Sequence, residues 1–578
     1  MHRLVVLVTS VALFVTACTS ATSQVSTPTT VAETTTTTVA TTTTVPPTTT
    51  TTEAPDGFGG QITIGLDVAV ESLNPFAPNS FRELLAGNLV WAVVYDIDPE
   101  TWEKIPDVVK DLPSRSGGVT LNDDGSMNVR YEIADDAMWS DGEPITGFDL
   151  AFTAAAMRDM AIEGEGGIDP VMATVVGTEG DGKSATITFS EPTLAVEDAL
   201  WIILPSQTLE GVDLVNGTDG WDWPSGGPFM VDEFDPFNEA RFVRNDLYWK
   251  TDDQGRSLPY LDAVTITETT KPGLQGDEPT SPVGDFVLRA IDVATVFNAP
   301  EDFRRMEAAV ADGAEFQRVR TPVIEHLTFN FSDTRYEGNP DSVNEFLDFR
   351  TALATAIDRE QILEETGVPW ASETPGILIP TGESAWSIYE AGIAMIPQLP
   401  DGATSVLTTT GNADERPKIV EAIAPAFTSA GVAYESELED SQLFFQTTIV
   451  EGAYDIGLWA WVGGETYRGQ LGLMEMLDPA ASPPDGNYGS WGSGGTANEA
   501  TARFSEIVAE ARSTIDSERF DELVREAEAI LAQELPLIPL YSRGSGLAVW
   551  PDVVSGIVHN GSRSTFTWNI ETWHHLAE

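Results

Sequence analysis

Hydrophobic positions along the chain follow two different periods, which predicts a mixed α and β structure. Apolar and polar side chains alternate from Met127 to Ile133, as in a half-buried strand, and Ile62 to Ile64 predicts another strand. Thr146 lies three residues before Asp149, close to the spacing of a capping box. We therefore expect a helix from Leu150 to Met160, and strands and helices follow one another without an internal repeat.

Three further segments have the apolar spacing of helices. The first is the apolar run from Leu84 to Val94. The second runs from Ile419 to Ala430, with a kink expected at Pro425 and an end at the following glycine. The third lies between Phe520 and Leu531 and is ended by Pro536.

The N-terminal residues have the pattern of an export segment. A basic start precedes an apolar run from Leu4 to Phe14, which is too short to span a bilayer as a stable helix. Small residues then precede Cys18, the only cysteine of the chain, in a pattern that resembles the bacterial lipobox. We predict a signal peptide over 1–18 and a lipid anchor on Cys18, which would place the protein at the outer face of the bacterial membrane.

The segment that follows differs in composition from the rest of the chain. Residues 19–56 are mostly threonine with valine, alanine and proline, which offers too little apolar surface to offset the entropy of ordering. We expect a disordered tether there. About 520 residues remain, more than one hydrophobic core normally holds, so two or three domains should follow.

Charge excludes several classes of partner. Lysine and arginine total 30 against 91 aspartate and glutamate, a net charge of −61, which excludes a general affinity for nucleic acid or anionic lipid. The acidic residues are scattered, and none of the loops has EF-hand spacing, so we expect no metal and no cofactor. A single cysteine also permits no internal disulfide.

The sequence contains no catalytic motif in the structural context that its chemistry requires. None of the five histidines pairs at the helical spacing of a zinc site, and no Gly-x-Ser-x-Gly elbow occurs. Gly177 to Ser184 matches a P-loop in spelling, but Ala185 to Phe189 predicts a strand where a helix is needed, so we expect a hairpin turn. The sequence favours a binding protein over an enzyme. A secreted hydrolase such as a glycosidase stays an alternative, since a catalytic pair could occur among so many carboxylates.

A series of short motifs extends along nearly the whole chain after the tether. The most specific stretch runs from Tyr131 to Asp149 and includes Trp139-Ser140-Asp141-Gly142. The other motifs lie at 72–75, 226–229, 244–249, 258–262, 350–359, 454–456, 538–541 and 568–571. Taken together and in this order, the motifs resemble the dipeptide/oligopeptide class (family 5) of extracellular solute-binding proteins of ABC importers. We interpret most of them as structural: Asp141 should accept backbone hydrogen bonds in a tight turn above Trp139, and Arg359 should offset a helix dipole.

The resemblance implies an α/β, two-lobed periplasmic-binding-protein-like fold with a hinge and a small domain inserted in the first lobe. The ligand, a short peptide or similar small solute, would be enclosed between the lobes and delivered to a permease with its ATPase subunits. We expect a monomer with no enzymatic activity. A ligand-sensing surface receptor with the same fold is the other alternative. The expected divisions are lobe I in three parts (57–104, 205–285 and 535–578), the inserted domain (105–204) and lobe II (286–534).

The expected ligand site departs from the family pattern at one position. In peptide-binding members an aspartate three residues after a tryptophan pairs with the α-ammonium of the peptide. Here Trp461 is followed at that distance by Gly464, and the neighbouring Glu465 is the candidate replacement. The aromatic residues are either walls of the site or core residues of a strand. The candidate ligand-binding residues are Asn74, Trp459, Trp461, Gly463, Glu465 and Tyr467.

Overall fold

The computed structural model describes most of the chain beyond the N-terminal segment. The predicted signal peptide, Cys18 and the tether lie outside the described residues, as does Glu465. The described residues are 58–76, 81–164, 168–218, 222–236, 238–269, 281–296, 300–332, 342–366, 376–378, 397–411, 415–464, 466–483, 486–493 and 495–576.

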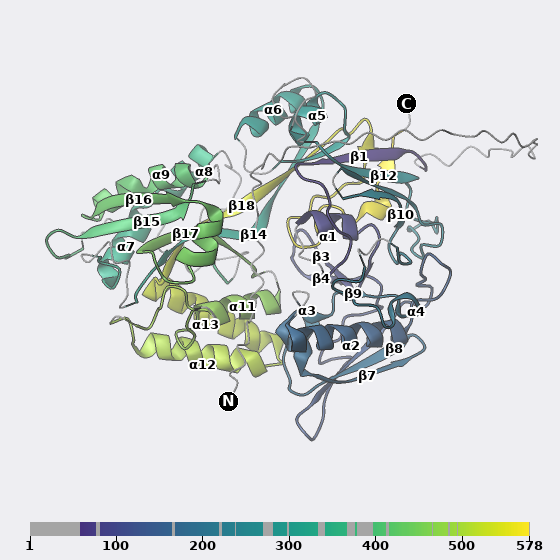
Figure 1. Cartoon of the computed structure of the whole chain (residues 1–578), viewed down its shortest axis with the longest axis horizontal. Coiled ribbons are helices and arrows are strands. Elements are labelled where there is room, and N and C mark those ends of the chain that lie inside the picture. Colours follow the sequence, from purple (N-terminus) through teal and green to yellow (C-terminus); the bar gives the residue numbers. More distant parts are fainter. Residues whose placement is uncertain are drawn as a thin grey trace, which may run out of the picture.

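A ten-stranded sheet runs through both halves of the molecule (Figure 1). Its middle strands are the longest, and the strands on either side of them belong to different lobes. The order across the sheet is β10 (Phe229–Asp235), β11 (Glu239–Arg244), β12 (Ala263–Glu268), β1 (Gln61–Leu66), β13 (Val293–Val296), β18 (Leu537–Val549), β14 (Glu315–Phe329), β17 (Ile456–Val462), β15 (Thr404–Thr410) and β16 (Ala433–Glu439).

Strands β14 and β18 cross between the lobes as an antiparallel pair (Figure 1). At one end β18 pairs with β13, and at the other end β14 pairs with β17. Their register breaks between Arg320 and Ile324, where the partners are Gly544 and Ser542. An irregularity of this kind interrupts the ladder and bends the strand, so the shared sheet is interrupted where the two strands cross between the lobes.

A second sheet and its helix lie at the far end of the first lobe (Figure 1). Strands β5 (Val119–Leu121), β6 (Met127–Glu132), β8 (Ser184–Phe189) and β7 (Val175–Asp181) form it in that order. Helix α2 (Gly147–Glu163) packs on β7 and β8 and begins with the predicted capping box of Thr146 and Asp149. The P-loop-like segment is the β7–β8 hairpin, with Gly182 at φ +56°, as predicted.

Smaller elements complete both lobes. The other strand pairs are β2 (Ala92–Val93) with β9 (Ile202–Ile203), β3 (Tyr95–Ile97) with β4 (Lys104–Pro106), and β19 (Val554–Ser555) with β20 (His574–His575). The other helices are α1 (Phe81–Gly87), η1 (Pro170–Thr174), α3 (Val196–Ala199), α4 (Ser206–Leu209), α5 (Pro282–Val287), α6 (Pro300–Ala311), α7 (Leu347–Ala356), α8 (Arg359–Thr366), α9 (Arg416–Ser429), α10 (Ser441–Leu443), the π-helix η3 (Phe444–Thr448), α11 (Tyr467–Leu477), α12 (Glu499–Ser513), α13 (Ser517–Glu534) and η4 (Ile570–Thr572).

Two large hydrophobic cores correspond to the two lobes. One core gathers β1, the strands near it and the C-terminal residues, including Ile62, Ile64, Trp139 and Trp573. The other gathers α7 to α9 and α11 to α13 around the lobe II strands. The predicted helices at 419–430 and 520–531 are confirmed as α9 and α13.

The prediction of a helix from Leu84 to Val94 is wrong beyond Gly87, where α1 ends. The carbonyls of Leu89 and Val90 accept hydrogen bonds from the backbone amides of Phe229 and Gly226. These bonds come from a distant segment and replace the bonds that a longer helix would need. Tertiary pairing therefore overrides an apolar spacing that is helical in isolation.

Candidate functional site

The predicted aromatic segment forms β17, and its two tryptophans have different surroundings. Trp459 is 2% exposed and packs with Phe444 and Tyr454 in a small separate cluster. Trp461, near the end of the strand, is half-buried. Its ring stacks on His326 of β14, with centroids 5.8 Å apart and planes at 12°. Trp459 is therefore a core residue, whereas Trp461 keeps a surface that a solute can contact.

His326 is the part of this site that the sequence analysis missed. It is fully buried, and burial lowers its pKa to about 4, so the ring is neutral at pH 7. Its Nδ1 lies 3.2 Å from the carbonyl of Ile324. Among the described residues neither its Nε2 nor the indole Nε1 of Trp461 has a hydrogen-bond partner. The pairing of His326 with Trp459 across β14 and β17 depends on strand register, which short motifs do not reveal.

The turn after β17 continues directly into α11. Gly463 and Gly464 have φ +146° and +85°, which favour glycine, and a Cβ on Gly463 would lie 3.3 Å from Leu473. Thr466 caps α11 by accepting from the amide of Gly469 at 3.0 Å. Tyr467 is the first residue of the helix and half-buried. Its ring packs against the core of lobe II rather than standing free.

Asn74 lies in the first lobe, and its side chain is occupied within the fold. It is 1% exposed and donates to the carbonyls of Leu214 and Thr218 at 2.8 and 3.0 Å. Its oxygen accepts from the amide of Phe76 at 3.0 Å. These bonds fix the loop that follows β1.

A buried charge cluster lies where the crossing strands enter lobe II. Arg543 of β18 donates from Nε to Glu325 of β14 at 2.9 Å and from Nη2 to Glu415 at 2.7 Å. Arg416, at the start of α9, approaches Glu325 to 3.4 Å. Burial by itself raises the pKa of Glu325, but the two guanidinium groups overcome it and lower the pKa to about 2. We call these four residues the crossing cluster.

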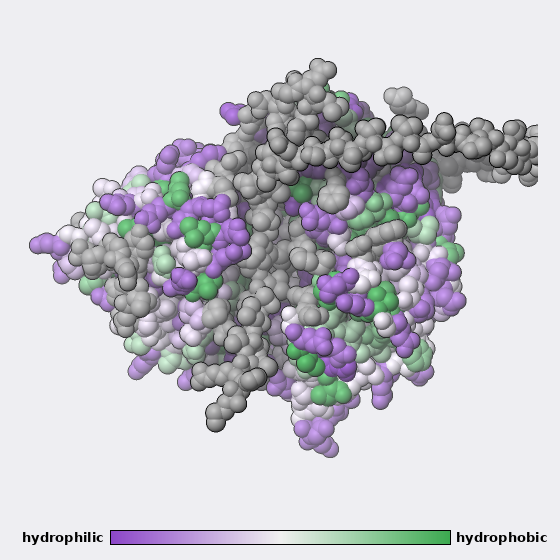
Figure 2. Space-filling model, in the orientation of Figure 1, coloured by the Kyte–Doolittle hydropathy of each residue, from purple (hydrophilic) through white to green (hydrophobic). Residues whose placement is uncertain are grey.

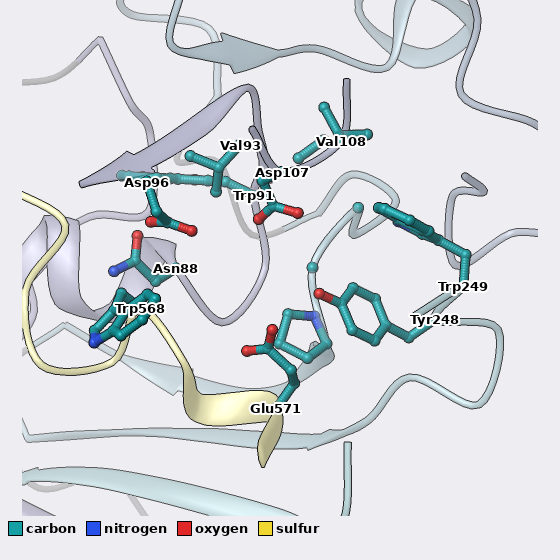
Figure 3. Close-up of a pocket in the computed structure, with 14 residues that line it drawn as sticks. Asn88, Trp91, Val93, Asp96, Asp107, Val108, Tyr248, Trp249, Trp568 and Glu571 are labelled. Carbon is teal, nitrogen blue, oxygen red and sulfur yellow. The ribbon is translucent and has the colours of Figure 1, made fainter. Parts of the chain in front are cut away.

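A second charge cluster surrounds a small hollow in the first lobe (Figure 3). Lys250 lies 2.6 Å from Asp107 and 3.4 Å from Glu571. Asp96 also lines the hollow, and burial, with Asp107 second, raises its pKa well above the ordinary value although Lys250 opposes this. Burial likewise raises the pKa of Glu571. We call these four residues the lobe I cluster.

Two structural motifs behave as the sequence predicts. Trp139 is 1% exposed beneath a turn in which Asp141 accepts from the amide of Glu143 at 3.0 Å. Arg359 donates to the carbonyl of Ala354 in the last turn of α7 at 3.3 Å, and also to Pro539 on β18. Both motifs therefore contribute to the fold.

Within the described ranges, no group of three or more histidine, cysteine, aspartate or glutamate residues is arranged to hold a metal ion. No helix in the same part of the chain is both long and apolar enough to cross a membrane. Hydrophilic side chains are spread over both lobes on the face shown in Figure 2.

The fold and the motifs agree with a comparison against known families. The chain belongs to the bacterial extracellular solute-binding proteins of family 5, whose model for the middle part matches residues 106–481. This confirms the resemblance stated on the motifs.

Individual relatives are distant. The oligopeptide-binding protein OppA of Mycobacterium tuberculosis is 23% identical over 401 residues, which are 63% of this chain and 62% of the relative. This chain thus spans less than two thirds of that relative. An uncharacterised lipoprotein of Mycobacterium tuberculosis is 24% identical over 517 residues, 79% of this chain and 84% of the relative.

Solved structures show the same fold. The periplasmic EDTA-binding protein EppA superposes with a TM-score of 0.70 at 18% identity, covering 92% of this chain and 98% of its own. The expected two-lobed α/β fold is therefore confirmed.

Proposed function

We propose that this chain is the substrate-binding lipoprotein of an ABC importer and captures a short peptide or similar small solute between its lobes. Family membership supports the class of function. The observation that carries the site is Trp461, a half-buried indole stacked on a neutral, buried His326 at the end of β17. A flat, uncharged wall of this kind suits the apolar part of many solutes.

The partners follow from the same proposal. A permease with its ATPase subunits receives the solute from the closed receptor, and a lipid on Cys18 holds the monomeric protein at the outer face of the membrane. The lipoprotein name of one relative supports the anchor. We also propose the divisions 57–104, 205–285 and 535–578 for lobe I, 105–204 for the inserted domain and 286–534 for lobe II.

The class of solute depends on charge at the binding segment. Gly464 stands where peptide-binding members carry the aspartate for the α-ammonium, so selection of a free amine rests on Glu465 in this proposal. Relatives and structural neighbours include an oligopeptide-binding and an EDTA-binding protein, so both a peptide and a metal chelate are suitable probes.

Thermal unfolding of the full chain with three probes tests the proposal. The probes are trialanine, N-acetyl-trialanine and the Fe(III)–EDTA chelate, and a bound probe raises the melting temperature as its concentration rises. We expect Trp461→Ala to lower the affinity for the probe that binds by about ten- to a hundredfold, as for a central aromatic contact. Trp568→Ala, at a half-buried tryptophan of the lobe I hollow, is the matched control and should leave affinity unchanged.

The acetylated probe separates the amine question from the site question. If Glu465 binds the ammonium, Glu465→Gln weakens trialanine binding and leaves the acetylated probe unaffected. Equal effects on the binding of both peptides would show that Glu465 does not bind the ammonium group. Equal losses in Trp461→Ala and Trp568→Ala would contradict the position of the site itself.

A further inference from the structure

Helix α11 begins immediately behind the candidate binding segment, and its first turn contacts the other lobe. The carboxylate of Asp198, on α3, accepts a hydrogen bond from the backbone amide of Arg468 at 2.6 Å. The carboxylate of Asp169, just before η1, lies 2.7 Å from Nε of the same arginine. One residue of α11 is thus bound twice, through its main chain and through its side chain.

The amide of Arg468 is one of the helix N–H groups that lack an intrahelical partner. Within α11 the cap is Thr466, which serves the amide of Gly469 instead. A carboxylate at this position both completes the cap and is favoured by the positive end of the helix. Asp198 therefore acts as a second cap, supplied by the opposite lobe.

The first lobe holds Asp198 firmly. Its side chain is 3% exposed and forms an ion pair with Lys104 of β4. The ammonium of Lys104 lies 5.2 Å from the ring centroid of Tyr467, the residue before Arg468. The cation of lobe I is therefore shared between the capping carboxylate and the first residue of α11.

A third contact joins the lobes without any of these charges. The amide of Leu194 donates to the carbonyl of Thr514, between α12 and α13, at 3.1 Å. Leu194 and Ala195 are buried in the core that gathers the helices of lobe II. The lobes thus meet through an apolar contact and through the acids at α11.

From these contacts we propose that Asp169 and Asp198 are positioning residues, which couple closure of the lobes to the placement of Tyr467 and the start of α11, beside Trp461. In the closed arrangement both acids fix the start of α11, so its first turn is held by lobe I as well as by lobe II. When the lobes separate, Arg468 loses its capping partner and the first turn is held by lobe II alone. This inference rests on the proposed function for its significance, because the segment it positions is the proposed solute site.

Arg468 offers a matched pair of variants for a test. Its guanidinium also contacts Glu475, at 3.0 Å, which lies on α11 itself. Asp169→Asn removes an acid from across the lobes, and Glu475→Gln removes one from within lobe II. Both variants neutralise one carboxylate of the same arginine, and Glu475→Gln also removes a partner of Arg512 within lobe II. Only Asp169→Asn removes a contact between the lobes.

The readout is amide hydrogen exchange in the full chain without any solute. For a coupling of ordinary size, Asp169→Asn should raise exchange at the Leu194 and Arg468 amides by about tenfold. Neither amide is bonded to Asp169, so a local role would leave Leu194 unchanged. Glu475→Gln should leave both amides within about twofold of wild type. Asp198→Asn should raise exchange at Leu194 as well.

Two results would overturn the inference: no change at Leu194 in either aspartate variant, or the same change in Glu475→Gln. Because the exchange measurement needs no solute, it stands even when trialanine and Fe(III)–EDTA both fail to bind, a result that counts against the proposed function alone. With a probe that binds, Asp169→Asn should raise its dissociation rate. An unchanged dissociation rate beside faster exchange would show that the contact joins the lobes without positioning the binding segment, which would overturn the coupling.

Discussion

The two buried charge clusters differ in their ratio of cations to carboxylates. The lobe I cluster has Lys250 for three acids, and the crossing cluster has two arginines for two acids. Burial raises carboxyl pKa values in both, but only the second has enough positive charge to reverse the effect, as the pKa of Glu325 shows. In these two clusters the number of cationic neighbours therefore decides whether a buried acid is held ionised, and burial alone does not.

The largest effect is expected from removal of a cation of the crossing cluster. Arg543→Met leaves Glu325, which is 0% exposed, with a single cationic neighbour, and should lower the free energy of unfolding by about 3–5 kcal/mol. Urea unfolding measures the change. Arg503→Met, which breaks the surface pair with Glu526, is the control and should cost less than about 1 kcal/mol. Equal costs for the two arginines would contradict a special role for the crossing cluster.

His326, which follows Glu325 in the sequence, should make the stability of the protein depend on pH. Burial lowers its pKa to about 4, below the ordinary 6.5, so the unfolded chain binds more protons between these values. The stability that this shift contributes is present above pH 6.5 and is lost as the pH falls towards 4, a change of about 3 kcal/mol. His326→Asn should remove this part of the slope in unfolding measured from pH 7 to 4. His559, whose pKa burial also lowers to about 4, should still contribute a slope of the same sign in this variant.

A smaller and oppositely directed dependence is expected in the lobe I cluster. Burial raises the pKa of Asp96 and Glu571, so the stability they contribute is present below their ordinary pKa values and is lost as the pH rises through the raised ones. Lys250→Met should lower the free energy of unfolding by about 2 kcal/mol at pH 8, because the acids lose their counter-ion. The loss should shrink at pH 5, where the carboxyls take up protons. A loss independent of pH would show that the lysine acts through packing alone.

Features set by neighbouring residues could be predicted from the sequence. The capping box of Thr146 and Asp149, the hairpin at Gly182 and the turn at Asp141 each depend on a few adjacent side chains. The family motifs also allowed the two-lobed fold to be predicted. The exception was the run after Leu84, where Phe229 and Gly226 supply hydrogen bonds from far along the chain.

The site itself depended on contacts that no local pattern contains. His326 meets Trp461 because β14 and β17 pair in one register, and Arg468 meets Asp169 where the two lobes are in contact. The aromatic segment forms β17, but the burial of Trp459 and the partial exposure of Trp461 depend on packing and could not be told apart by spacing. The ion pairs of the two charge clusters join residues far apart in the sequence, so they too could not be predicted from local patterns.

The continuity of the first core with both ends of the chain has a consequence for biosynthesis. Ile62 and Ile64, near the start, share that core with Phe566 and Trp573, near the end. A ribosome delivers these groups hundreds of residues apart, whereas most of the other core lies between them in the sequence. The lobe whose first strand emerges earliest is therefore the last to be completed, and its early strand must wait for nearly the whole polypeptide before its apolar face is covered.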